Sequence, residues 1–213
     1  MKPEINVTNL ARFNEVMENS SETVAENLSA MTSEPMEVEV KKLRFLKEGV
    51  SEEISDDGEG EVVCVYCGLQ DPPNGVFAVT FSPEEAAEVS QFMMGSLPDE
   101  YGEDHGMVVQ EIGNVMTSGF VDGIADMLGK KIEITTPTVF DGDAEAVADH
   151  LKKQTESGPA TFVVLNTVIN AVDHDVRCRA FLLPNIDEFA ELVNTIPELD
   201  TEEEAEDEKK PFD

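Results

Sequence analysis

The segment from Val108 to Pro137 constrains the fold most, because it joins a long amphipathic helix to a strand. Its apolar residues and glycines recur every three or four positions, which is typical of a helix with one buried face: Val108, Ile112, Val115, Met116, Gly119, Phe120, Gly123 and Met127. Gly129 ends the helix. Ile132, Ile134 and Thr136 then alternate as a strand that Pro137 closes. The segment therefore predicts a helix packed on a sheet.

The opposite face of this helix is polar and is predicted to lie in solvent. Its members are Glu111, Asn114, Ser118, Asp122 and Ala125. Glu111 and Asn114 are three positions apart, so their side chains point the same way. Taken alone, such a pair is most often solvated surface. It becomes a candidate site only if the surrounding sequence supports one.

The charge of the chain excludes several classes of partner. Forty-six acidic residues against fourteen basic ones give a formal net charge of -32. Nucleic acid and anionic membrane surfaces are therefore poor partners. An acidic interaction tail or a cytosolic protein of a salt-in halophile would explain the excess. We favour the halophile, because the acids also lie on predicted helix faces. The absence of a signal or an apolar span, with an odd number of cysteines, predicts a cytoplasmic protein.

The first half of the chain follows a helix, strand, hairpin, helix order. Residues 1–8 are expected to be flexible, and an apolar stripe from Leu10 to Met31 then predicts a helix. Met36, Val38 and Val40 alternate as a strand, and residues 49–61 read as an acidic loop. A hairpin over 62–81 and a helix that Ser82 caps complete this half.

The second half repeats this order with an added short helix. After Val108–Pro137 come a short helix over 144–153, a hairpin over 161–183 and a last helix that opens at Pro184. Residues 197–213 are expected to be an acidic disordered tail.

Three cysteines and three histidines show no spacing typical of a metal site, and Cys64 and Cys67 fall on opposite faces of a predicted strand. We therefore expect no bound metal.

The two halves predict an internal duplication. Glu15 and Glu111 are 96 positions apart, and Pro83 and Pro184 are 101 apart, which leaves room for the added helix. The predicted fold class is α+β: one domain over 9–196, with repeat one at 9–95 and repeat two at 105–196. The strands would form one continuous mixed or antiparallel sheet with helices packed on it and pseudo-two-fold symmetry.

The motif Glu111-Ile112-Gly113-Asn114, with Pro137 placed 23 residues after the asparagine, resembles the signature of the CheC/CheX/FliY chemotaxis phosphatases. The segments Tyr101–Glu111 and Thr161–Phe189 are also similar to CheC, so the likeness covers roughly 10–196. The chain looks most like a CheC protein, and its acidity suggests a halophilic archaeon.

The resemblance implies hydrolysis of the phospho-aspartate of a CheY-type response regulator. Asn114 would hold the attacking water in line with phosphorus, and Glu111 would anchor the regulator. Ser118 and Asp122 would surround them. The family carries no metal of its own, because the regulator brings the Mg²⁺. CheC proteins also bind the receptor deamidase CheD, so CheD is a possible second partner.

The first half departs from the family pattern. The positions that align with Glu111 and Asn114 are Glu15 and Glu18, and lysine replaces the trailing proline at position 41. A carboxylate cannot donate to water and would repel a phosphoryl group, so we expect this site to be inactive and the protein to have a single active site.

One alternative comes from a different functional class. The same fold occurs in flagellar switch proteins without catalytic residues, so the chain could be a non-catalytic adaptor for CheD or CheY-type partners. Intact Glu111 and Asn114 favour the enzyme, whereas the degenerate Glu15/Glu18 site favours the adaptor.

Overall fold

A computed structural model describes residues 4–32, 34–55, 58, 60–95, 97–155, 161–171 and 174–196. The elements in chain order are α1 (Val7–Thr32), β1 (Met36–Leu46), α2 (Ser51–Ile54), β2 (Glu61–Leu69), β3 (Gly75–Phe81), α3 (Pro83–Met94), α4 (Glu103–Leu128), β4 (Thr138–Asp143), α5 (Ala144–Gln154), β5 (Phe162–Ala171), β6 (His174–Pro184) and α6 (Ile186–Asn194). No helix in the described ranges is long and apolar enough to cross a membrane.

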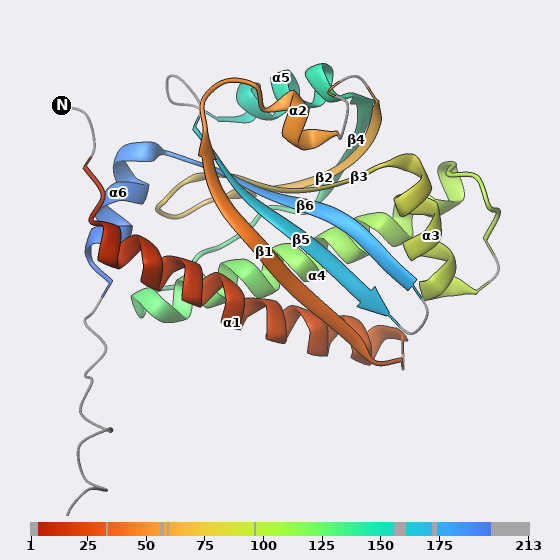
Figure 1. The fold of residues 1–213 in the computed structure, drawn as a ribbon, viewed down its shortest axis with the longest axis horizontal. Helices are drawn as coiled ribbons and strands as arrows, with labels where there is room; N and C mark the ends of the chain where they lie inside the picture. The colour runs from red at the N-terminus through yellow and green to blue at the C-terminus, as the bar shows by residue number, and fades with distance from the viewer. Residues whose placement is uncertain are drawn as a thin grey trace, which may run out of the picture.

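The described strands form one antiparallel sheet in the order β1-β5-β6-β3-β2-β4. The larger core lies between one face of this sheet and the helices α1, α3, α4 and α6. The smaller core lies between the other face and the short helices α2 and α5. Figure 1 shows α1 and α4 crossing one side of the sheet and the two short helices on the other. The predicted α+β class and continuous sheet are confirmed.

The topology is unchanged when the two halves of the chain are exchanged. Exchanging β1 with β4, β2 with β5 and β3 with β6 gives the same strand order, read from the opposite edge of the sheet. α1 and α4 are both 26 residues long and start 96 positions apart. Every buried residue of α1 has a buried counterpart 96 positions later in α4. A duplication would produce this pattern, and common ancestry of the halves stays a prediction.

The first half also contains a short helix, which corrects the expectation of a plain acidic loop over 49–61. α2 lies in that range, at the position that α5 occupies in the second half. Val50 and Ile54 are four positions apart and are buried against the sheet in the smaller core. Arg44 of β1 also pairs with Glu53 of α2. The sequence did not predict this helix, because only two apolar residues at helical spacing occur in a run dominated by acidic residues.

The expected strand over 132–136 is wrong, and the strand lies after Pro137 instead of before it. Of that segment, only Ile134 makes a strand-like pair, an isolated bridge with Leu69. The hydroxyl of Thr135 accepts the backbone N–H of Gly68 at 2.8 Å, so a side chain replaces a backbone partner there. Proline has no N–H to continue the ladder, and β4 begins only at Thr138.

Three details of the predicted helices also need correction. α4 begins at Glu103, five residues before the expected Val108, because Gly102 serves as its N-cap residue and Glu103 and Asp104 suit the first turn. Ala125, expected in solvent, is buried. α1 begins at Val7, inside the segment expected to be flexible, and the Asn6 backbone N–H donates to the Asn194 side chain. The expected tail over 197–213 lies outside the described residues.

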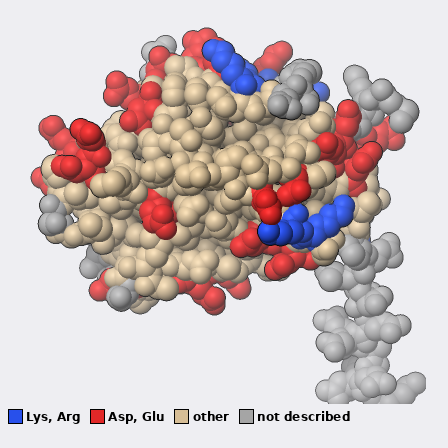
Figure 2. Space-filling model, turned by 180° about the vertical axis from the view of Figure 1, so that it is seen from behind, with Lys and Arg blue, Asp and Glu red and all other residues tan. Residues whose placement is uncertain are grey.

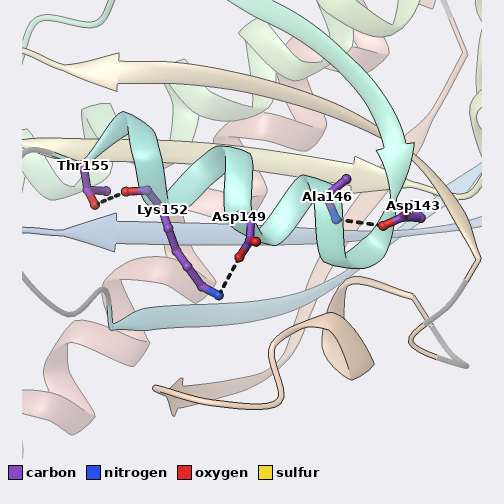
Figure 3. A network of polar contacts seen from close by, with 5 residues as sticks. All are labelled: Asp143, Ala146, Asp149, Lys152 and Thr155. Carbon is purple, nitrogen blue, oxygen red and sulfur yellow. Dashed lines mark hydrogen bonds and ion pairs between the residues drawn. The ribbon is translucent and has the colours of Figure 1, made fainter.

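α5 closes the smaller core and has well-defined ends. The side chain of Asp143 accepts from the backbone N–H of Ala146 at 2.8 Å, which caps the helix start (Figure 3). Lys152 pairs with Asp149 at 3.2 Å, and the Thr155 hydroxyl donates to the Lys152 carbonyl at 2.8 Å.

Figure 2 shows the molecule from behind, with acidic side chains scattered over the visible face and basic ones in a few places.

We expect Gly119→Ala to lower the free energy of unfolding by about 1–3 kcal/mol. α1 and α4 pack so closely that an added Cβ at position 119 would lie 2.5 Å from the Val24 side chain. Gly106→Ala is the matched control on the same helix, because its Cβ would meet nothing within 4 Å. Alanine should there be neutral or stabilising by up to about 1 kcal/mol. Chemical denaturation of both variants in KCl checks this, and equal effects would contradict the close approach.

Candidate functional site

The candidate residues Glu111, Asn114, Ser118 and Asp122 lie along the outer side of α4. Glu111 and Asp122 are exposed, whereas Asn114 and Ser118 are half-buried. Within the described ranges, no hydrogen bond or ion pair engages the side chains of Glu111 and Asn114. The carboxylate of Glu111 and the amide of Asn114, about one turn apart, are therefore free to contact a partner.

A hydrogen bond fixes α4 one turn before Asn114. The side-chain amide of Gln110 donates to the carbonyl of Pro137 at 2.6 Å. Gln110 and Asn114 are four positions apart and therefore neighbours on the helix surface. The proline of the sequence motif and the helix that carries the motif thus contact each other directly.

Close packing fixes the same helix one residue before Asn114. An added Cβ at Gly113 would lie 2.5 Å from the side chain of Val65 in β2. Val65 is fully buried, so it has little room to move away. Only glycine allows α4 to approach the sheet this closely beside Asn114.

Two further contacts hold the start of α4. His105 is buried; its Nδ1 accepts the backbone N–H of Gly102, and its Nε2 lies 3.0 Å from the carbonyl of Pro98. These roles require the neutral tautomer with hydrogen on Nε2. The Tyr101 hydroxyl donates to Asp141 of β4, and burial followed by the charge of Asp141 raises the pKa of Tyr101 to about 12. Burial also raises the pKa of Asp141, although the bond from Tyr101 opposes this.

The equivalent surface of α1 is built differently. Glu15 and Glu18 are both exposed, but the Asn14 amide donates to the Glu18 carboxylate at 2.7 Å. Met17 stands where α4 has Gly113. Glu18 is therefore a charged group with an internal partner, in contrast to the free neutral amide of Asn114.

The cysteine pair does not form a site. Cys64 packs in the smaller core, whereas the Cys67 thiol contacts Thr117 of α4 on the other side of β2. Burial raises the pKa of both thiols, which keeps them protonated and unreactive. Among the described residues, no group of three or more His, Cys, Asp or Glu could hold a metal ion.

Several residues near the site were not singled out from the sequence. Gln110, Tyr101 and His105 act through partners that lie far away in the sequence or in the preceding loop, so no local pattern marks them. Met107 is 76% exposed and lies one turn before Glu111. The only sequence feature that marks Met107 is that this large apolar side chain lies outside the apolar stripe predicted for the helix.

We expect Tyr101→Phe to reduce the loss of stability at high pH. A tyrosine with a pKa raised from 10.0 to about 12 stabilises the fold fully below pH 10, and this contribution is lost as pH rises through 12. Denaturation at pH 9 and pH 11 should show a smaller decrease for Tyr101→Phe than for wild type. Tyr66→Phe, which changes the other tyrosine, is the control. A decrease equal to that of wild type would contradict the raised pKa of Tyr101.

A protein family and a sequence relative resemble this chain. A model of the CheC-like family matches residues 108–140, which include α4 from Val108 onward and Pro137. The chain is 31% identical over 199 residues to CheC1 of Halobacterium salinarum, named as a candidate CheY-P phosphatase; the alignment covers 92% of this chain and 100% of the relative.

Solved structures share the fold. FliY of Thermotoga maritima superposes with a TM-score of 0.75 at 16% identity, covering 91% of this chain and 99% of FliY. FliM of Helicobacter pylori, in its complex with SpeE, superposes with a TM-score of 0.65 at 11% identity, covering 90% and 95%. Because the alignment with CheC1 extends along nearly the whole chain, this protein belongs to the CheC-like family of chemotaxis proteins.

Proposed function

We propose that this protein ends a chemotaxis signal by hydrolysing the phospho-aspartate of a CheY-type response regulator, with a single active site on α4. The observation that carries the proposal is the pair of Glu111, which is exposed, and Asn114, which is half-buried; neither has an internal partner among the described residues, and both lie on a turn of α4 that Gln110 and Gly113 fix in place. The likeness to the candidate phosphatase CheC1 points to the same reaction.

Asn114 would position the attacking water. The amide oxygen accepts a hydrogen bond from water while the amide N–H can donate to a phosphoryl oxygen, and neither role changes with pH. The water oxygen forms a bond to phosphorus as the bond between phosphorus and the aspartate oxygen breaks. The products are inorganic phosphate and the free aspartate of the regulator. Alignment of the water is the main service that the protein supplies in such a reaction.

Glu111 would bind the regulator. An exposed carboxylate without an internal partner can pair with a lysine of the regulator beside the phosphorylated aspartate. The regulator would bring Mg²⁺, which neutralises charge on the phosphoryl group. Glu111 and Asp122 are eleven positions apart, or about 16 Å along the helix, so they cannot share an ion. Ser118, between them, would form part of the contact surface with Asp122.

A non-catalytic adaptor is the second candidate function, with a CheY-type regulator or CheD as its partner. The observation in its favour is α1, where the internally bonded Glu18 replaces the asparagine. FliM of H. pylori, which has a similar fold, is found in a complex with SpeE. Binding of the regulator without faster loss of phosphate would favour this function over the enzyme.

We expect Asn114→Ala to lower kcat by about a hundredfold, because the water loses its orientation. Glu111→Ala should raise KM by about tenfold through loss of a charged contact. Glu18→Ala, at the equivalent position of α1, is the matched control and should change neither. Loss of phosphate from a phosphorylated CheY-type regulator at high KCl measures all three. Unchanged decay with wild-type protein that still binds the regulator would refute the enzyme and support the adaptor.

We expect Met107→Gln to raise KM by about tenfold with little change in kcat. A docked regulator would cover this exposed side chain, and burial of a methionine contributes about 1.5–3 kcal/mol. Glutamine has nearly the same shape without the apolar end. Val7→Thr is the control, because Val7 is 80% exposed at the start of the other long helix. Equal KM values for Met107→Gln and wild type would place Met107 outside the docked surface.

A further inference from the structure

We infer that Gln110 is a positioning residue for the proposed reaction: through the carbonyl of Pro137 it holds the turn of α4 that presents Asn114. The inference rests on the proposed function, because the positioned group is the one that would orient the water. Gln110 itself would not touch the regulator's phosphoryl group.

The contact joins two parts of the fold that are 27 positions apart in the sequence. The Gln110 amide donates to the Pro137 carbonyl at 2.6 Å, and both residues are half-buried. Partial burial weakens the competition from water for this bond. Since Gln110 is one helical turn before Asn114, the bond restrains the helix backbone directly beneath the candidate group.

The Pro137 carbonyl is available to Gln110 because the sheet is irregular at this point. Tyr66 pairs with Thr138, and Leu69 pairs with Ile134. The three residue steps from Tyr66 to Leu69 in β2 therefore lie opposite four steps between Ile134 and Thr138, which is the arrangement of a β-bulge. Proline suits the extra position, because it has no N–H to offer the ladder. The proline of the motif thus lies at the point where the irregular edge of the sheet contacts α4.

A second contact restrains the same turn. Gly113 precedes Asn114 and packs on Val65 without room for a Cβ. Gln110 and Gly113 are three positions apart, so they hold the helix against the sheet on the side that faces it. Rotation or sliding of α4 would break one contact or the other, which leaves Asn114 a narrow range of positions.

Among its described residues, the first half keeps the bulge but shows neither contact. The register of β1 shifts between Val40 and Lys42, which is the position equivalent to Pro137. Asn14 occupies the place of Gln110, but its amide bonds to Glu18. Met17 occupies the place of Gly113. α1 therefore lacks the restraints as well as the water-orienting amide.

The test replaces Gln110 by methionine, which has similar length and no N–H donor. We expect kcat to fall about tenfold, because a small displacement of a positioned group is costly, with KM within about twofold of wild type. The side-chain NH₂ resonances of Asn114, assigned by their loss in Asn114→Ala, should shift or broaden in the NMR spectrum. Asn14→Leu, which removes the equivalent amide from α1, is the control and should alter neither readout.

Either of two results would overturn the inference: an unchanged kcat, or a lower kcat with unmoved Asn114 resonances. If Gln110→Met does not fold, Gln110→Glu answers the same question, because it keeps the shape but has no N–H donor at neutral pH. The resonances need no turnover. If wild type proves inactive, the proposed function fails, while the spectrum still decides whether Gln110 positions Asn114.

A second arm tests the first half. In an Asn114→Ala background, Glu18→Asn places an amide on α1 without the restraints found on α4. We expect no recovery of turnover. Recovery to wild-type rates would show that an amide at this helix position suffices, and it would overturn the role of Gln110 in catalysis.

Discussion

The close approach of α4 to its neighbours is the constraint on which the rest of the structure depends. Gly113 lies against Val65 of the sheet, and Gly119 lies against Val24 of α1, both at distances that exclude a Cβ. Backbones this close leave a helix little freedom to rotate or slide. The outward direction of Glu111 and Asn114 is therefore set by apolar contacts on the opposite side of the helix.

The two halves share one framework but differ in the polar side chains that they present on α1 and α4. Buried positions correspond along α1 and α4, and the strand order is unchanged on exchange of the halves. Around Asn114 and Glu18, the two halves differ at exposed positions and at the sheet-facing positions of Gly113 and Met17. A framework can remain symmetric while its polar surface diverges, because core packing constrains volume and shape, whereas exposed positions tolerate substitution.

The polar contacts around the site suit a chain of this acidity. At about 1 M salt the Debye length is only about 3 Å, so exposed ion pairs contribute little. The contacts that fix α4 are instead half-buried hydrogen bonds and close packing, as seen at Gln110, His105 and Gly113. These contacts are themselves weakened little by salt.

The sequence by itself determined the long helices, both hairpins, the α+β class and the placement of Glu111 and Asn114 on the outer side of α4, because helical and strand periodicity are local properties of the chain. It did not determine α2, whose two buried residues lie in an acidic run, or the break at Pro137, which depends on the partner strand. The contacts of Gln110, Tyr101 and His105 were decided only by the tertiary structure. Each joins groups that periodicity cannot relate, since only packing brings their atoms within hydrogen-bonding distance.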